Sequence, residues 1–191
     1  NRLYVHDAVY DAFADKLAAA VAKLRVGPGN EADVVIGPLI DGNAVAKVQA
    51  HLADALEKGA KVLQGGKPHA LGGHFFEPTV ITGVTADMRV AREETFGPLA
   101  PLFRFSDEAE VVRQANDTEF GLAGYFYTRD LGRTFRVAEA LEYGMVGINT
   151  GLISNEVAPF GGMKSSGLGR EGSKYGLDEY LEIKYLCLGG I

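Results

Sequence analysis

Apolar residues recur three or four positions apart in three segments of the chain, which is the spacing of one face of an amphipathic helix. The apolar positions are Val9, Phe13, Leu17, Val21 and Leu24 in the first segment, Val45, Val48, Leu52 and Leu56 in the second, and Leu131, Phe135, Ala138 and Leu141 in the third. We expect one helix in each segment. A fourth helix is predicted from about Asp107 to Ala115, with Ser106 as its N-cap and Ala109, Val112 and Ala115 turned inward.

Short runs rich in β-branched and aromatic residues lie between the predicted helices, and such runs favour strands. The runs are Leu3–Val5, Lys61–Leu63, Thr79–Ile81, Leu99–Phe105, Gly124–Tyr127 and Met145–Ile148. Because helices and strands alternate, the pattern predicts the α/β class, with a mostly parallel sheet flanked by helices and ligands beyond the carboxyl ends of its strands. No internal repeat or low-complexity linker is present, so we expect no second independent domain.

The run Tyr180–Leu188 differs from the others because it alternates strictly, with Leu181, Ile183, Tyr185 and Cys187 on one side. A strand with such an apolar face must pack either on this chain's own sheet or on another subunit. Cys187 lies on that face, and we interpret it as a buried packing residue rather than a nucleophile.

Composition narrows the classes of partner. The chain has 191 residues, of which 47% are hydrophobic and 23% charged, as is ordinary for a globular domain. Its 19 Lys and Arg are scattered and outnumbered by 25 Asp and Glu, so we expect no nucleic acid partner.

No apolar run approaches the ~20 residues that cross a bilayer, so no membrane segment is predicted. A single cysteine excludes an internal disulfide and fits a reducing compartment, so we expect a cytoplasmic protein.

The stretch Gly167–Gly172 fits the G-x-G-x-x-G spacing of a dinucleotide-binding turn. Such a turn follows a buried strand and opens a helix, whose N-terminus receives the pyrophosphate. Here the preceding residues read Gly-Gly-Met-Lys-Ser-Ser, which is typical of a loop, and the following residues offer at most one helical turn before the alternating run. We therefore interpret Gly167–Gly172 as a glycine-rich surface loop.

The four histidines, His6, His51, His69 and His74, show neither a metal-ligand spacing nor a nucleophile motif. We assign them no chemistry and expect no metal site. His51 lies at the edge of the apolar face of its predicted helix, and we expect it to be solvated.

The segment Arg92–Pro98 places two carboxylates, Phe96 and a Gly-Pro turn directly before a predicted core strand. Sites in α/β proteins are built at strand ends. A carboxylate there could bind sugar hydroxyls, with Phe96 against a ring. The alternative is a solvated acidic loop with one core phenylalanine.

Three motifs occur together and in order. They are Glu93–Pro98 (Glu-Glu-Thr-Phe-Gly-Pro), the run from Asn149 to Gly162 that ends in Pro-Phe-Gly-Gly, and Ser166–Glu171 (Ser-Gly-Leu-Gly-Arg-Glu). With them, essentially the whole chain resembles the aldehyde dehydrogenase superfamily. The runs Gly151–Gly162 and Gly169–Gly176 most resemble its members that act on succinate semialdehyde.

The resemblance implies that residues 1–178 are the C-terminal part of a catalytic domain with a Rossmann-like sheet, and that 179–191 are an oligomerisation strand and tail of a homodimer or homotetramer. It implies NAD or NADP as cofactor and an aldehyde as substrate. The family's cysteine nucleophile, which forms a thiohemiacetal and a thioester, and its general base would both lie upstream, so the chain alone is expected to be inactive.

Four residues of this sequence match positions with known roles in the family. Glu94 matches the carboxylate that binds the nicotinamide ribose, and Phe96 matches the aromatic residue beside it. Ser154 matches a hydroxyl that helps to bind the substrate carboxylate, and Phe160 matches an aromatic residue near the aldehyde tunnel. The implied reaction is oxidation of succinate semialdehyde to succinate. The alternatives are a sibling that oxidises glutarate semialdehyde, and a non-catalytic oligomerisation or binding module.

Overall fold

The computed structural model describes residues 2–190, which form two compact units. The first extends to Val111 and the second begins at Val112. Among the described residues, no helix combines the length and the apolar content that are needed to span a bilayer.

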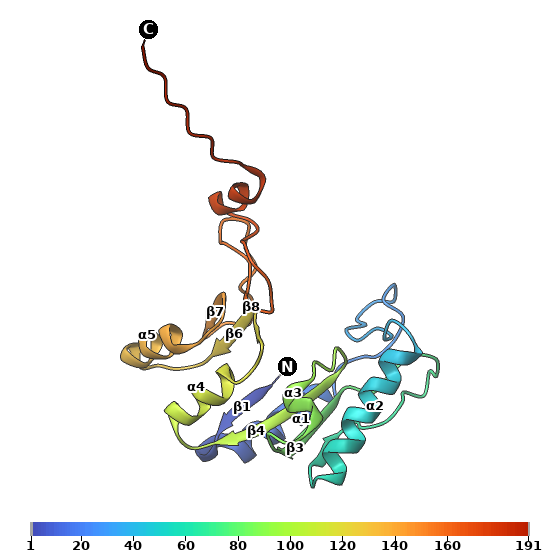
Figure 1. The fold of residues 1–191 in the computed structure, drawn as a ribbon. Helices are drawn as coiled ribbons and strands as arrows, with labels where there is room; N and C mark the ends of the chain where they lie inside the picture. Colours follow the sequence, from blue (N-terminus) through green and yellow to red (C-terminus); the bar gives the residue numbers. More distant parts are fainter. Residues whose placement is uncertain (1, 191) are drawn as a thin grey trace. The chain divides into compact units, whose positions relative to one another are not determined.

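The first unit is built on a four-stranded sheet in the order β1, β4, β3, β2 (Figure 1). The strands are β1 (Leu3–His6), β4 (Leu99–Phe105), β3 (Thr79–Val84) and β2 (Lys61–Gln64). Strand β4 pairs in parallel with both β1 and β3, whereas β2 joins β3 antiparallel at the edge. The predicted α/β class with a mostly parallel sheet is confirmed, and all four of these strands coincide with predicted runs.

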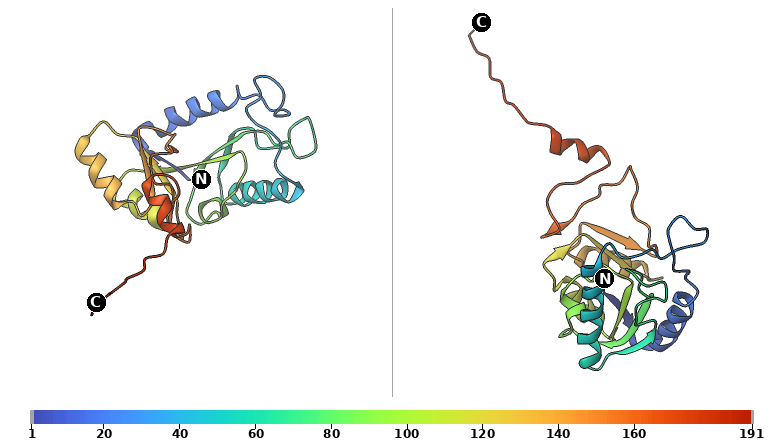
Figure 2. Two further views of the ribbon diagram at one scale, coloured as in Figure 1. Left: turned by 90° about the horizontal axis from the view of Figure 1, so that it is seen from above. Right: turned by 90° about the vertical axis from the view of Figure 1, so that its right-hand side faces the viewer.

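Two helices cover opposite faces of this sheet (Figure 2). Helix α1 (Tyr10–Val21) packs on Val80 and Leu102, and α2 (Gly42–Glu57) packs on Ile81 and Phe103. Neighbouring residues of a strand point to opposite faces, so the continuous apolar runs of β3 and β4 supply both cores. The central strands are therefore buried on both sides.

Tyr10 forms hydrogen bonds at an irregularity in the pairing of the two central strands. The β3–β4 register shifts between Ile81 and Val84, where Gly83 has a φ of +69°. The buried hydroxyl of Tyr10 accepts a hydrogen bond from the Gly83 N–H (3.0 Å) and donates one to the Leu102 carbonyl (2.9 Å). The side chain thus satisfies backbone groups that the ladder leaves unpaired. A short 3₁₀-helix, η1 (Asp7–Val9), brings it there from β1.

The second unit holds two small sheets, a parallel pair of β6 and β7 and an antiparallel pair of β5 and β8. Its strands are β5 (Phe120–Gly121), β6 (Ala123–Phe126), β7 (Met145–Ile148) and β8 (Met163–Lys164). Helix α5 (Leu131–Ala140) connects β6 to β7, and the 3₁₀-helix η2 (Lys174–Tyr180) follows the glycine-rich loop. The two-residue strands β5 and β8 were too short to predict.

Helix α4 (Glu108–Asn116) confirms the fourth predicted helix but corrects its details. The Asp107 carboxylate, not the Ser106 hydroxyl, caps the helix, because its Oδ1 accepts from the Glu110 N–H at 2.8 Å. Ala109 is exposed rather than turned inward, and no residue of this helix is fully buried. Ser and Asp both favour the N-cap position, so the sequence defines the start of this helix only to within one residue.

The run Tyr180–Leu188 does not form a strand within the described chain. Tyr180 ends η2, and residues 181–190 have no ladder partner among residues 2–190. Leu181 is extended, with φ −117° and ψ 141°. Cys187 is exposed, so the expectation of a buried thiol is wrong for this chain, because none of its described surfaces covers that face. Pairing with a second subunit stays a prediction.

Candidate functional site

The segment from Glu93 to Gly97 leads from the short helix α3 (Arg89–Arg92) into the central strand β4. Thr95 is the one buried residue of this segment. Thr95 is buried with 5% of its surface exposed, whereas Glu94 is exposed and Phe96 is 83% exposed. The buried Thr95 fixes the segment to the body of the unit, and the exposed Glu94 and Phe96 present a carboxylate and an aromatic ring next to the start of β4.

A buried histidine holds this segment against α2. His51 is fully buried; its Nδ1 lies 2.9 Å from the Thr95 Oγ1 and its Nε2 lies 3.1 Å from the Glu93 Oε2. The expectation that His51 is solvated is therefore wrong. Helical spacing placed it correctly at the margin of the apolar face, but its two polar partners lie more than 40 residues away in sequence. A buried imidazole is stable there because both ring nitrogens are hydrogen-bonded.

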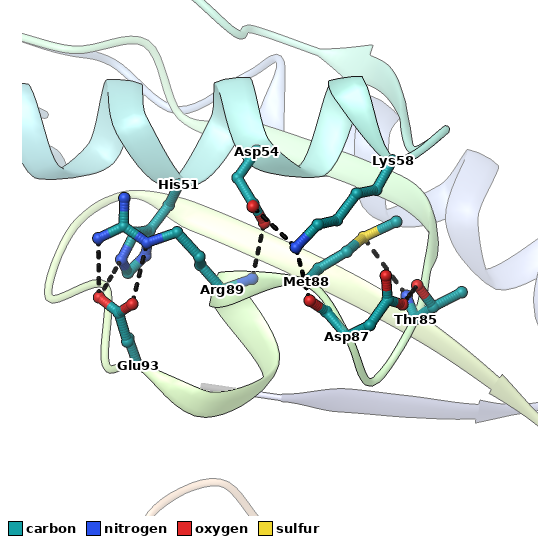
Figure 3. Close-up of polar contacts among 8 residues, drawn as sticks. All are labelled: His51, Asp54, Lys58, Thr85, Asp87, Met88, Arg89 and Glu93. Atoms are coloured by element: carbon teal, nitrogen blue, oxygen red, sulfur yellow. Dashed lines mark hydrogen bonds and ion pairs between the residues drawn. The ribbon is translucent and has the colours of Figure 1, made fainter.

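Arg89 completes this cluster (Figure 3). Its guanidinium pairs with the Glu93 carboxylate through Nε–Oε1 at 2.9 Å and Nη2–Oε2 at 3.0 Å. The bonds from Arg89, with a further one from His51, lower the pKa of Glu93 to about 2. Glu93 is thus a carboxylate at any physiological pH and accepts hydrogen bonds from both neighbours.

A second set of bonds joins α2 to the start of α3 (Figure 3). The Asp54 carboxylate accepts from the Arg89 backbone N–H at 2.7 Å and from the Lys58 ammonium at 2.8 Å. Lys58 also donates to the Asp87 carbonyl at 2.6 Å. The pKa of Asp54 is lowered, first by its bond with Lys58 and then by that with Arg89. Residues of α2 therefore bind both the beginning of α3, through Asp54, and the residue after its end, through His51.

Phe96 combines an unfavourable backbone with an exposed ring. Its φ is +43°, in the left-handed region that side chains with a Cβ rarely occupy. Such a conformation costs of order 1–3 kcal/mol and persists where the surroundings impose it, often at ligand-binding positions. Neither the exposed ring nor the strained backbone of Phe96 stabilises the fold. This combination favours a role for Phe96 in binding.

Glu94 contrasts with Glu93. Within residues 2–190, no hydrogen bond or ion pair engages its carboxylate, although it adjoins the Arg89–Glu93 pair. Its oxygens are therefore available to donors from a ligand. Glu94 and Phe96 were both singled out from the sequence, and the structure leaves both side chains exposed on one segment.

In the second unit, Asn149 fixes the start of the loop that carries Ser154. Its side chain accepts from the Thr128 N–H and donates to the Thr128 carbonyl, both at 2.8 Å. The loop thereby begins at the carboxyl ends of β6 and β7, where α/β proteins place ligands. Ser154 is exposed in this loop, and the Glu156 carbonyl is tied to the Ser173 N–H at 2.9 Å.

The glycine-rich motifs pack on each other. Phe160 and Glu171 exchange backbone hydrogen bonds of 2.8 and 2.7 Å, and Arg170 donates to the Gly162 carbonyl at 2.9 Å. A Cβ on Gly161 would lie 2.5 Å from the Gly169 carbonyl oxygen. Close backbone approach therefore explains the glycine at position 161. The preceding strand β8 has two exposed residues, so the interpretation of Gly167–Gly172 as a surface loop is confirmed.

Phe160 is partly exposed at 36%, beside the Ser154 loop and within the same unit. The structure therefore groups the predicted site residues as two pairs. Glu94 and Phe96 lie in the first unit, and Ser154 and Phe160 lie in the second. The roles of all four residues stay predictions.

Comparison with known proteins identifies the family. The family model for the aldehyde dehydrogenase family matches residues 1–186. The chain belongs to this family. A glutarate-semialdehyde dehydrogenase of Pseudomonas aeruginosa is 74% identical over the whole chain, and the succinate-semialdehyde dehydrogenase [NADP(+)] of Escherichia coli is 70% identical over 99% of it. A 3-sulfolactaldehyde dehydrogenase of Pseudomonas putida is 69% identical over the whole chain.

The chain spans about two fifths of the length of these aldehyde dehydrogenases, 40% of the first and 39% of the other two. Solved structures agree with the fold. A succinate-semialdehyde dehydrogenase from Burkholderia pseudomallei superimposes with a TM-score of 0.96 at 72% identity, over 98% of this chain and 39% of that one. A betaine aldehyde dehydrogenase from Staphylococcus aureus, in complex with NAD+, has a TM-score of 0.88 at 39% identity, over 94% and 37%.

The strain at Phe96 leads to a stability prediction for the complete protein. Phe96→Gly should be at least as stable as Phe96→Ala, because glycine adopts a positive φ without a steric cost. At ordinary extended positions, glycine is less stable than alanine by roughly 0.5–1 kcal/mol. The measurement is the free energy of unfolding in urea. Exposed Ile40, whose φ is not positive, is the control, where Gly should be less stable than Ala. An equal penalty at both positions would show that Phe96 is unstrained.

Proposed function

We propose that the chain is part of an NAD(P)-dependent aldehyde dehydrogenase in which Glu94 and Phe96 contact the cofactor. The observation that carries this proposal is the exposed, unengaged carboxylate of Glu94 beside the strained, exposed ring of Phe96, on a segment otherwise fixed by buried contacts. Both groups suit a nicotinamide nucleoside, since a carboxylate accepts from ribose hydroxyls and an aromatic ring packs on a flat heterocycle. When bound, the dinucleotide supplies the hydride acceptor.

The residues of this chain bind and orient in this proposal, and they do not provide the nucleophile. The only cysteine in the sequence, Cys187, lies exposed in residues 181–190, which carry no regular secondary structure. A reactive thiolate needs a neighbouring cation, base or helix N-terminus to lower its pKa. We therefore propose that the nucleophile comes from outside these 191 residues, and that the isolated chain has no turnover.

The proposed substrate is an aldehyde with an anionic group at its far end, with succinate semialdehyde as the first candidate. Succinate semialdehyde, glutarate semialdehyde and 3-sulfolactaldehyde, which appear in the names of the relatives, all share an aldehyde and an anionic end. Ser154 is the residue of this chain that we propose as a donor to that end, and Phe160 would contact the aldehyde chain. The 74% identical relative named for glutarate semialdehyde makes that substrate the second candidate.

We propose further that the complete enzyme is a homodimer or homotetramer, and that residues 179–191 pair with another subunit. The apolar side chains Leu181, Ile183 and Tyr185 are exposed here. An uncovered apolar strand would promote uncontrolled association, so a defined pairing is the stable arrangement.

Glu94→Gln in the complete enzyme should weaken NAD(P) binding and slow hydride transfer while changing the KM for the aldehyde little. A charge-assisted hydrogen bond contributes on the order of 1.5–3 kcal/mol, which is roughly ten- to hundredfold in affinity. Cofactor titration and pre-steady-state absorbance at the NAD(P)H band measure both effects. Glu57→Gln, an exposed carboxylate on α2, is the matched control. Unchanged cofactor affinity together with an unchanged hydride rate would remove Glu94 from the site.

Ser154→Ala should lower the preference of the complete enzyme for succinate semialdehyde over an uncharged aldehyde of similar length. Loss of a donor to a buried acceptor costs roughly 1–3 kcal/mol. The ratio of kcat/KM for the two aldehydes reports the effect, and glutarate semialdehyde in the same assay ranks the two candidate substrates. Ser106→Ala, in the loop before α4, should leave the ratio unchanged. If Ser154→Ala does the same, Ser154 does not contact the substrate.

Deleting the residues after Asp178 from the complete enzyme should reduce its oligomeric state, as measured by light scattering at low micromolar concentration. Ile183→Asp should have the same effect, because a charge on the apolar face opposes burial. Lys184→Ala, on the other side of the alternating run, should not. A truncated enzyme that keeps the parent's mass would refute the intersubunit strand.

A further inference from the structure

We propose that His51 is a positioning residue that orients Glu94 and Phe96 toward the cofactor. This inference rests on the proposed function, because it assigns the buried imidazole a role in the same cofactor contact. His51 itself touches neither cofactor nor substrate in this proposal. It acts through the backbone of the segment that carries Glu94 and Phe96.

The geometry of the two hydrogen bonds made by the His51 ring is the first support for this role. The two ring nitrogens of His51 engage the residues on either side of Glu94, with Nε2 at 3.1 Å from the Glu93 carboxylate and Nδ1 at 2.9 Å from the Thr95 hydroxyl. Fixing both neighbours of a residue restricts the backbone that carries its side chain. Glu94 lies between the two residues that His51 binds, and its own side chain is exposed.

The second support is the regular docking of the segment on α2. Gly97 lies against Val48, where an added Cβ would come within 2.5 Å of Val48 Cγ2. One turn further along the helix, His51 binds Thr95 and Glu93, and one turn beyond that, Asp54 binds the Arg89 N–H. Residues three apart lie on one helix face. Three successive turns of α2 thus hold the chain from Arg89 to Gly97, and His51 is the middle contact.

The bonding roles of the ring follow from its neighbours. Glu93 is ionised through its pairing with Arg89, so it can only accept, and the proton of a neutral His51 ring belongs on Nε2. Nδ1 of the neutral ring then accepts from the Thr95 hydroxyl. In the described residues, no buried side-chain nitrogen or oxygen lacks a partner, so both bonds belong to a fully satisfied network. Such networks hold one conformation more strictly than apolar contacts do.

The strained backbone of Phe96 explains why the segment needs the two hydrogen bonds from His51. A φ of +43° relaxes if its neighbours are free to move, and Thr95 is the neighbour that His51 holds. Releasing Thr95 therefore allows Phe96 to leave the left-handed region and carries Glu94 with it. The loss should appear in cofactor affinity before it appears in the fold.

The test uses the complete enzyme with variants that remove one or both bonds. His51→Leu removes both and keeps most of the volume. His51→Asn retains an amide near the Nδ1 position, and His51→Gln retains one near Nε2. We expect the Kd for NAD+ and NADP+ to rise about tenfold in His51→Leu and less in the two amide variants, as loss of one or two hydrogen bonds implies. The aldehyde KM should change less than about twofold.

Two controls separate positioning from general destabilisation. Leu52→Ala removes a neighbouring buried side chain of the same core but breaks neither hydrogen bond of His51, so it should lower stability but leave the cofactor Kd within about twofold. Thr95→Val removes the hydroxyl at constant shape and Thr95→Ser keeps it. Thr95→Val should weaken cofactor binding and Thr95→Ser should not. This pair keeps the test valid if His51→Leu does not fold.

The double variant His51→Leu, Glu94→Gln distinguishes failure of this inference from failure of the proposed function. If His51 acts through Glu94, the two losses of cofactor affinity will be markedly less than additive. If Glu94→Gln weakens binding but His51→Leu and Thr95→Val do not, the positioning role is overturned and the proposed cofactor contact stands. If Glu94→Gln has no effect, the contact itself is overturned, and the role of His51 with it.

Discussion

The contact between α2 and the segment from Arg89 to Gly97 is the constraint on which the candidate site depends. The segment has to leave a short helix, expose a carboxylate and a ring, and enter the central strand within a few residues. An unsupported loop could not hold Phe96 at a positive φ, because its backbone would relax. Packing at Val48, two bonds from His51 and one from Asp54 supply the support.

The scaffold beneath this contact explains its rigidity. Strand β4 is buried on both faces, with Leu102 under α1 and Phe103 under α2, and it pairs with a strand on each edge. Elements packed in this way resist displacement, since interiors are dense and repack only in discrete steps. The candidate cofactor residues therefore stand directly before an element that cannot shift without disturbing both cores. Binding groups placed on such elements keep their geometry better than those on free loops.

The sequence predicted the fold class and most of the longer elements, and it singled out two residues that the structure leaves exposed before β4. Helical spacing located α1, α2 and α5, β-branched runs located six strands, and the motif at Glu93–Pro98 located Glu94 and Phe96. It missed His51, because periodicity reports only which side of a helix faces the core. Whether a marginal polar residue is solvated depends on partners distant in sequence, here Glu93 and Thr95. The polar residues Glu93, Glu94 and Thr95 before a core strand were the only available signal of a buried polar contact. Nothing in their spacing connects them to His51.

Apolar patterning also predicts that a residue is buried, but it does not identify the surface that covers the residue. Leu131 and Phe135 lie on the predicted apolar side of α5, and Ile183 on that of the alternating run, yet all three are exposed in the described chain. An amphipathic pattern records the environment of a residue in the assembled protein, whereas one chain can bury only what its own surfaces reach. The pattern therefore predicts burial at these positions that the described chain alone does not supply. The one buried residue of α5 is Val137, which is not among the four apolar positions from which the helix was predicted.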